Sequence, residues 1–207
     1  MIKTLSLYIG GSIIFLLGMI AYGIFLDFRK TSLNELLIER KITKVEKPRL
    51  VINRIDYKLH FYIDTILIKT YNIALGGNPK YSKQTKNDRY TPTGDYFICS
   101  KKQTTGLGKI LVLNYPSIED AVRGLRNGLI TEEEFRQIQE SYYEKECPPM
   151  DTELGGYMKI HGNGKFDFIL RNLPFVFNWT DGSIAVNNSE IEELYENCPI
   201  GTPVFIY

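Results

Sequence analysis

The chain has 207 residues, a formal net charge of +1, an apolar fraction of 43% and a charged fraction of 24%. These values are close to the globular average and exclude wholesale disorder, collagen-like repeats and a coiled-coil rod. The length allows one domain, or one domain with a tail. Proteins that hold nucleic acid usually carry a basic excess, so the near-zero charge argues against nucleic acid as a partner.

Residues 5–26 form an apolar stretch of 22 residues without a charged side chain. That length crosses a hydrocarbon core of about 30 Å. A cleaved signal peptide would have a shorter apolar core, and Ala21-Tyr22-Gly23 is a poor cleavage site. We therefore predict an uncleaved membrane anchor in residues 1–30. The basic residues behind it favour the cytoplasmic side by charge alone, but this rule weakens when a long domain follows.

Residues 31–49 read as a short helix and a linker. Ser32 and Glu35 have the capping-box spacing, which predicts a helix over about residues 32–41, and the linker 42–49 is polar.

From residue 50 the pattern changes to β-branched and aromatic runs typical of strands. We expect strands at 50–55, 58–63, 66–75, 94–99, 109–115, 157–162, 183–186 and 203–207. His60 lies in the second of these, and we interpret it as a strand residue on a partly solvated face.

Helices interrupt the strands at two places. Capping patterns at Ser117 and Thr131 predict two helices before Pro148-Pro149, and a further helix is expected at about 189–197. Together these elements predict a mostly β (α+β) domain over residues 50–207 that contains a helical insert.

The three cysteines are Cys99, Cys147 and Cys198. Their number is odd and no Cys-x-x-Cys pair occurs, so the sequence predicts neither a disulfide framework nor a zinc site. We interpret all three as small thiols, buried or at the surface. No pattern indicates a cofactor or a metal.

The candidate chemistry lies near the C-terminus. His161 ends a predicted strand and is followed by Gly162-Asn163-Gly164, and Ser183 opens another strand after Gly182. A nucleophile after a glycine, facing a histidine base, is an arrangement suited to acyl transfer, because nearby backbone N–H groups can receive the oxyanion. One His and one Ser are a weak signal by themselves.

Several blocks in the same order resemble the L,D-transpeptidases with a YkuD-like catalytic domain. The resemblance covers about residues 50–207. It rests on Asp88-Arg89-Tyr90-Thr91-Pro92-Thr93-Gly94, Leu113-Asn114-Tyr115-Pro116, Thr152-Glu153-Leu154-Gly155-Gly156, Ile160-His161-Gly162-Asn163-Gly164, Asn178-Trp179-Thr180-Asp181-Gly182-Ser183-Ile184-Ala185 and Gly201-Thr202-Pro203-Val204.

The resemblance implies a β-sandwich catalytic domain that acts on peptidoglycan stem tetrapeptides. In that family a Cys thiolate attacks the peptide carbonyl, D-alanine leaves, and an amine or water takes the acyl group. Carried over, His161 is the base, and the N–H groups of Gly182 and Ser183 are the oxyanion donors. The groove residues would be Gly162, Trp179, Thr180 and Asp181.

One departure is large, because Ser183 stands where the family has its nucleophilic Cys. A hydroxyl is a poorer nucleophile than a thiolate, so we expect a rate well below that of a Cys enzyme. Two hypotheses stay open. The first is a membrane-anchored acyl transferase, with Ser183 either a working nucleophile or an engineered replacement of Cys; the second is an inactive relic that binds peptidoglycan or a partner. A cytoplasmic body would be deprived of this substrate, so we expect the domain outside the cytoplasmic membrane.

Overall fold

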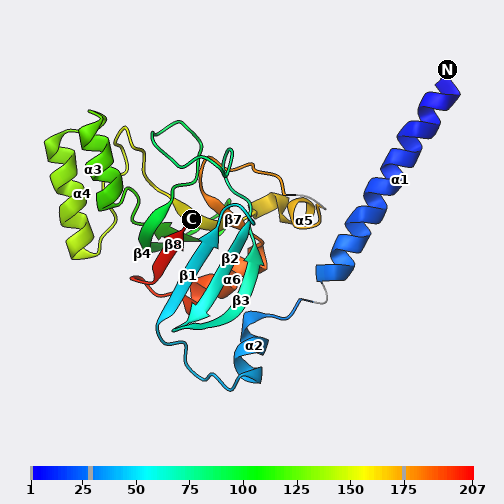
Figure 1. The fold of residues 1–207 in the computed structure, drawn as a ribbon. Coiled ribbons are helices and arrows are strands. Elements are labelled where there is room, and N and C mark those ends of the chain that lie inside the picture. The colour runs from blue at the N-terminus through cyan, green and yellow to red at the C-terminus, as the bar shows by residue number, and fades with distance from the viewer. Residues whose placement is uncertain (1, 28–29, 174–175) are drawn as a thin grey trace.

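Eight strands form one continuous hydrogen-bonded series. The computed structural model describes residues 2–27, 30–173 and 176–207, and the strand order is β3-β2-β1-β8-β4-β5-β6-β7 (Figure 1). The strands are β1 (Pro48–Asn53), β2 (Lys58–Ile63), β3 (Ile66–Asn72), β4 (Gly94–Thr104), β5 (Gly108–Leu113), β6 (Lys159–Gly162), β7 (Ile184–Val186) and β8 (Pro203–Ile206). Among the named strands of the described residues, only the β1–β8 and β6–β7 pairs are parallel.

The long strand β4 joins the two halves of the series. Its first residues pair with β8, from Gly94 to Phe97, and the rest pairs with β5, with a register shift between Ile98 and Ser100. Such an irregularity bends a strand, so the two halves can face each other. The large core cluster lies between them and includes Leu50, Phe61, Ile98, Leu113, Ile160 and Ile184.

The two ends of the series meet. Beyond β3, Ala74 exchanges two backbone hydrogen bonds with Ala185 of β7, each 2.8 Å long. This contact brings the chain after β3 alongside the chain before β7. The region from Gly76 to Thr91 is thereby placed beside residues 180–183.

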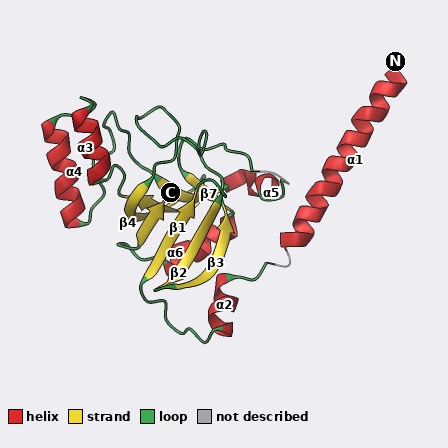
Figure 2. Ribbon diagram, viewed as in Figure 1, coloured by secondary structure: helices red, strands yellow, loops and turns green. Residues whose placement is uncertain are grey.

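The predicted helices are present, with capping boxes at the expected residues. Ser32 caps α2 (Leu33–Glu39), Ser117 caps α3 (Ile118–Arg126) and Thr131 caps α4 (Glu132–Glu144). Asn187 and Glu190 form the box of α6 (Asn188–Asn197), which packs on β5 and β6. Figure 2 shows α3 and α4 side by side, away from the sheet, as the helical insert. The insert has its own small core of Ala121, Ile130, Ile138 and Leu154.

The prediction for two of the three cysteines was wrong. Cys99 of β4 and Cys147, which follows α4, form a disulfide with their Cα atoms 5.1 Å apart. An odd cysteine count led us to expect three thiols, but the return of the chain from the insert places Cys147 against β4. The bond fastens the insert to the sheet. Cys198 is a buried thiol, as expected.

The first helix, α1 (Ile2–Asp27), stands apart from the sheet (Figure 1). Thr4–Phe25 is long and apolar enough to cross a membrane, and none of this stretch is buried in the protein. A core helix would be covered by other elements, so the exposure fits an anchor or a signal sequence. Positions 1, 28 and 29 of the predicted anchor region lie outside the described residues.

The link between β6 and β7 contains short helical turns that the strand and helix patterns did not predict. They are the 3-10 turn η1 (Gly164–Phe166) and α5 (Asp167–Leu170). Several apolar side chains of this link are exposed. In Figure 1 this link lies on the side of the sheet nearest to α1.

Candidate active site

His161 is the third residue of the short strand β6, which lies between β5 and β7. It pairs with Ile110 on one side and with Ala185 on the other, and only 2% of it is exposed. Its ring nitrogen Nδ1 lies 2.7 Å from the carbonyl oxygen of Gly162. A carbonyl oxygen can only accept, so Nδ1 carries the proton and donates it. The lone pair is therefore on Nε2, as a general base requires.

Burial keeps this imidazole neutral. It lowers the pKa of His161 from 6.5 to about 4; the hydrogen bond to Gly162 works in the opposite direction, and the positive charge of Lys159 lowers it further. A burial penalty on the charged form is the usual reason for such a shift. At neutral pH His161 is thus able to accept a proton.

Ser183 ends the turn that leads into β7. The residue is 9% exposed, and the hydroxyl of Thr180 donates to its carbonyl oxygen over 2.6 Å. The N–H of Thr180 donates to Leu75, which ties the start of the turn to the chain beyond β3. Within the described ranges, no acceptor takes the N–H of Gly182 or of Ser183. These two adjacent donors are of the kind that form an oxyanion hole.

Residue 182 has to be glycine. Its φ of +102° lies in the region that disfavours L side chains. A Cβ at this position would also lie 2.6 Å from the carbonyl oxygen of Tyr90. On its other side Gly76 approaches so closely that a Cβ there would be 2.2 Å from the Gly182 nitrogen. The turn is therefore packed between two backbone segments.

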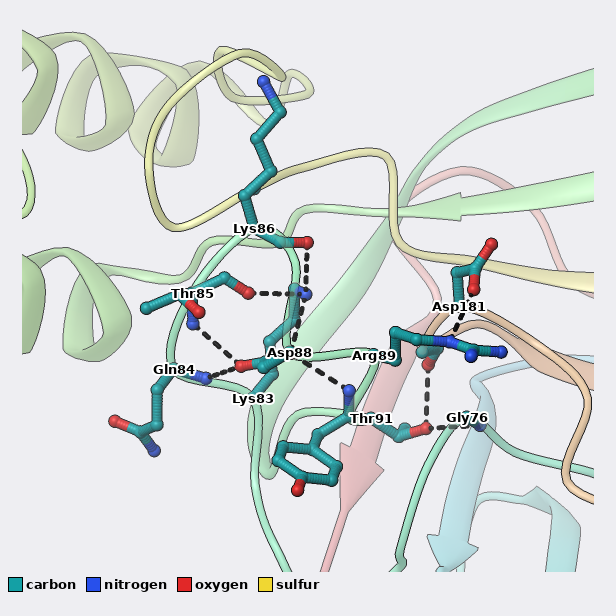
Figure 3. Close-up of polar contacts among 12 residues, drawn as sticks. Gly76, Lys83, Gln84, Thr85, Lys86, Asp88, Arg89, Thr91 and Asp181 are labelled. Atoms are coloured by element: carbon teal, nitrogen blue, oxygen red, sulfur yellow. Dashed lines mark hydrogen bonds and ion pairs between the residues drawn. The ribbon is translucent and has the colours of Figure 1, made fainter.

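The hydroxyl of Thr91 fixes the peptide between Gly182 and Ser183. Thr91 is buried and donates to the carbonyl oxygen of Gly182 over 2.8 Å, and its oxygen accepts from the N–H of Gly76 at 3.4 Å (Figure 3). In a trans peptide the C=O and the following N–H point in opposite directions. By holding the Gly182 carbonyl, Thr91 aims the N–H of Ser183 away from itself.

Asp88 organises the loop that carries Thr91. Its carboxylate accepts the N–H groups of Gln84, Thr85 and Tyr90 and lies 3.2 Å from the ammonium of the buried Lys83. Figure 3 shows these contacts converging on the one carboxylate. Burial opposes its charge, but these donors together lower the pKa of Asp88 below its usual value. The network makes the loop a fixed support.

The remaining predicted site residues lie around this turn. Asp181 is exposed, and its carboxylate is 2.8 Å from Nε of Arg89. Trp179 meets His161 edge to face, with ring centroids 5.6 Å apart, and lines a cavity of about 250 Å³. Gly162 is buried and faces α6, since a Cβ there would lie 2.5 Å from Oδ1 of Asn188. Neither His161 nor Ser183 is among the residues that line this cavity.

His161 lies on β6 and Ser183 directly precedes β7, the neighbouring strand, but the structure does not join their side chains. In the part of the chain that the structure describes, no hydrogen bond links their side chains. Catalytic hydrogen bonds are often long in ligand-free enzymes and tighten only with substrate, so this geometry leaves the pair available for chemistry.

Sequence reasoning gave no role to Thr91, Asp88 or Gly76. Asp88 and Thr91 belong to one block of the resemblance, whereas Gly76 belongs to none. The contact of Thr91 with the turn joins residues far apart in the chain, since Thr91 and Gly182 are 91 positions apart. His60 behaves as expected: it lies on β2, partly exposed, with Nδ1 2.9 Å from the hydroxyl oxygen of Thr70.

Among the described residues, no group of three or more His, Cys, Asp or Glu side chains is placed to hold a metal ion.

Comparisons with known proteins agree on the fold. The family model of the YkuD L,D-transpeptidase catalytic domain matches residues 47–206. Among solved structures, the helical cell shape determining protein Pgp2 (K307A mutant) from Campylobacter jejuni is 18% identical, with a TM-score of 0.50 over 84% of this chain and 54% of that one. Bd1075 from Bdellovibrio bacteriovorus is 16% identical, with a TM-score of 0.48 over 79% and 48%.

An L,D-transpeptidase from Xylanimonas cellulosilytica DSM 15894 is 15% identical, with a TM-score of 0.41 over 80% of this chain and 62% of that one. Each match thus covers less than two thirds of the neighbour's chain. No curated protein matches this sequence. The sheet-rich α+β fold expected from the sequence, with its helical insert, is confirmed.

Proposed function

Since this chain belongs to the YkuD family of L,D-transpeptidase catalytic domains, we propose that it transfers acyl groups from peptidoglycan stem tetrapeptides, with Ser183 as nucleophile and His161 as base. One observation carries the proposal. A neutral imidazole with its proton fixed on Nδ1 lies on the strand next to a turn that presents two unused backbone N–H groups. A base and an oxyanion hole are the two devices that acyl transfer needs.

In the first half of the reaction, Nε2 of His161 takes the proton of the Ser183 hydroxyl while Oγ bonds to the substrate carbonyl carbon. The carbonyl electrons move to oxygen, and the N–H groups of Gly182 and Ser183 stabilise that oxyanion. When the carbonyl re-forms, the C–N bond breaks. The proton on His161 passes to the leaving nitrogen, and D-alanine departs.

In the second half, an amine of another stem peptide attacks the ester on Ser183. His161 removes a proton from the attacking nitrogen and returns one to Oγ as the ester bond breaks. The enzyme is restored and a new peptide bond links the two stems. Water in place of the amine would give hydrolysis.

The serine lowers the expected rate. A Cys is a few per cent thiolate at neutral pH, whereas a Ser hydroxyl needs its proton removed during the attack. His161, with a pKa of about 4, is a weak base for that step. We therefore propose a slow enzyme compared with a Cys-containing member of the fold.

The second candidate is an inactive protein that binds stem peptides or a partner. The observation in its favour is the missing hydrogen bond between His161 and Ser183 within the described residues. A site shaped for a longer C–S bond would leave Oγ short of both the base and the carbonyl carbon.

Intact-mass spectrometry separates the two candidates. The full chain in detergent is incubated with a stem tetrapeptide and, separately, with a carbapenem, next to the Ser183→Ala and Ser183→Cys variants. The proposal predicts an acyl adduct on the Ser183 protein that Ser183→Ala cannot form. An adduct on Ser183→Cys alone would contradict it and favour the binding protein, because the site would be intact but without a competent nucleophile.

We also propose that α1 anchors the chain and that the domain faces the outside of the cytoplasmic membrane. The apolar, unburied stretch Thr4–Phe25 supports the anchor. The Cys99–Cys147 disulfide supports the orientation, since such bonds persist in oxidising compartments and are rare in the cytosol.

A further inference from the structure

The link between the two halves of the candidate site carries an unusual exposed surface. Five apolar side chains on it are between 47% and 65% exposed, and we call them the apolar patch: Phe166, Phe168, Ile169, Val176 and Phe177. Single exposed apolar residues are ordinary, but five of them within residues 166–177 mark a segment that is suited to being covered by something else.

The link that carries the patch touches the end of the candidate membrane span. A Cβ on Gly23 of α1 would be 3.0 Å from Oδ1 and 3.1 Å from Cα of Asn172, so the link touches the last turns of α1. A cavity of about 600 Å³ between them is lined by Met19 and Tyr22 on one side and by Leu173 on the other. Figure 1 shows α5 next to this end of α1.

This contact sets the level of Asn172, and so of the link around it, relative to a bilayer. The apolar span ends at Phe25. At a rise of about 1.5 Å per residue, Gly23 lies about 3 Å and Met19 about 9 Å inside that end. Elements that touch these residues are at the level of the headgroups and upper acyl chains. Tyr22, 63% exposed, is a side chain typical of that zone.

The charges around the patch also fit a lipid surface. Lys165 precedes Phe166 and is exposed. Ammonium groups at this level can reach lipid phosphates. The acidic groups nearby are close to cations of their own: Glu190 lies 3.7 Å from Lys30, and Asp167 lies 3.8 Å from Arg171.

We propose that the apolar patch is immersed in the outer part of the lipid bilayer and forms, with α1, a second membrane contact. The patch belongs to the segment that runs from His161 to the Ser183 turn. Immersion therefore holds the candidate site at the membrane surface and covers the cavity lined by Val176, Phe177 and Trp179. This inference rests on α1 being an anchor and does not depend on the chemistry proposed for Ser183.

Fluorescence quenching by lipids tests the proposal. The full chain with Phe168→Cys carries an environment-sensitive dye at that position and is reconstituted into vesicles whose lipids bear nitroxides on the upper acyl chain. Selective labelling is possible without reductant, since Cys198 is buried and the other two cysteines are bonded to each other. Labels at Tyr143→Cys, exposed on the distant helical insert, and at Phe15→Cys, in the span, serve as controls.

The proposal predicts a blue-shifted dye at position 168, quenched several-fold more strongly than the dye at 143. Quenching at 15 but not at 168 overturns it and leaves the anchor standing. A dye at 168 that is shielded from water yet unquenched overturns it in favour of a protein partner or a second copy. Absence of quenching at 15 overturns both the anchor and the patch contact. Acyl-adduct formation by Ser183 is measured separately and is unaffected by any of these outcomes.

Discussion

Thr91 donates a hydrogen bond from a buried position to the carbonyl oxygen of Gly182, whose peptide carries the Ser183 N–H that we propose for the oxyanion hole. Thr91→Val keeps the shape but removes the donor. The peptide is then free to rotate, and a misplaced oxyanion donor costs roughly 10²–10³ in rate. We expect acylation of the Ser183→Cys background by a carbapenem to slow by roughly 10–100-fold, with binding of the carbapenem little changed. The measurement is the rate of adduct formation by intact mass.

Thr91→Ser is the matched control, because it keeps the hydroxyl and loses only a methyl group. It should restore most of the acylation rate even though it packs less well than Val. If Thr91→Val and Thr91→Ser slowed acylation equally, the Thr91 side chain would act through its packing and not through its hydroxyl, and the orientation of the Ser183 N–H would have another cause.

His161 links the pH to the stability of the fold. Its pKa is about 4 in the folded chain and 6.5 in the unfolded chain, so the unfolded chain binds more protons between these values. Stability is therefore unaffected above pH 6.5 and falls as the pH drops towards 4, by about 3 kcal/mol. Urea unfolding at several pH values should show this loss for the native chain and a smaller one for His161→Gln. Equal losses would mean that His161 is not buried in its neutral form.

The sequence predicts His161 and Ser183 as site residues because each sits in a short motif with distinctive neighbours. It did not identify Thr91 as a support, because hydrogen bonds between distant segments follow from the closure of the sheet. Ala74 has to meet Ala185 before Gly76 and Thr91 can reach Gly182.

Among the elements, the helical insert depends on one covalent link. The Cys99–Cys147 bond spans a sequence separation of 48 residues. In the chain-entropy view a loop of this size contributes roughly 4 kcal/mol, with 2–4 kcal/mol typical of measured disulfides. We expect Cys147→Ser to lower the free energy of unfolding by about that amount and to speed proteolysis within α3 and α4. Urea unfolding and limited proteolysis measure the two effects.

The double variant Cys99→Ser/Cys147→Ser provides the check on this prediction. Because either change alone removes the same bond, the double variant should be about as unstable as the single one, and reductant should lower only the native chain to this level. A further large loss in the double variant would show that the side chains act separately.

Local patterns predicted most of the elements. The capping boxes at Ser32, Ser117 and Thr131 mark real helix starts, since their side-chain hydrogen bonds involve only residues three apart. The strands were found near their true positions, although β4 continues to Thr104 where a strand ending at 99 was expected. The turns η1 and α5 were not predicted, because neither has a capping side chain and together they cover few residues.

At the scale of the whole molecule, the disulfide reports on which side of the membrane the domain lies. Blocking free thiols during cell lysis and then counting blocked sites by mass should show only Cys198 modified once the chain is unfolded. The Cys99–Cys147 pair should stay oxidised, because an extracytoplasmic compartment preserves disulfides. Three modified cysteines would place the domain in the cytoplasm, as the basic flank alone suggests.

The pairing of these cysteines was beyond sequence reasoning for a physical reason. The odd number of cysteines and the absence of a Cys-x-x-Cys motif describe only the sequence, in which Cys99 and Cys147 are far apart. The bond depends instead on where the insert returns to the sheet, which brings Cys147 to β4 with a Cα separation of 5.1 Å. The contact of α1 with Asn172 likewise joins segments that are distant in the sequence, so it could not be predicted from local patterns.

Release of D-alanine is the decisive test of Ser183 as the nucleophile. The full chain in detergent is given a stem tetrapeptide with an acceptor stem, and free D-alanine and cross-linked product are quantified over time. We predict slow release that is abolished by Ser183→Ala, strongly reduced by His161→Gln and increased by Ser183→Cys. Release that persists in Ser183→Ala, or no release by the native chain while Ser183→Cys is active, would contradict the assignment of Ser183 as a working nucleophile.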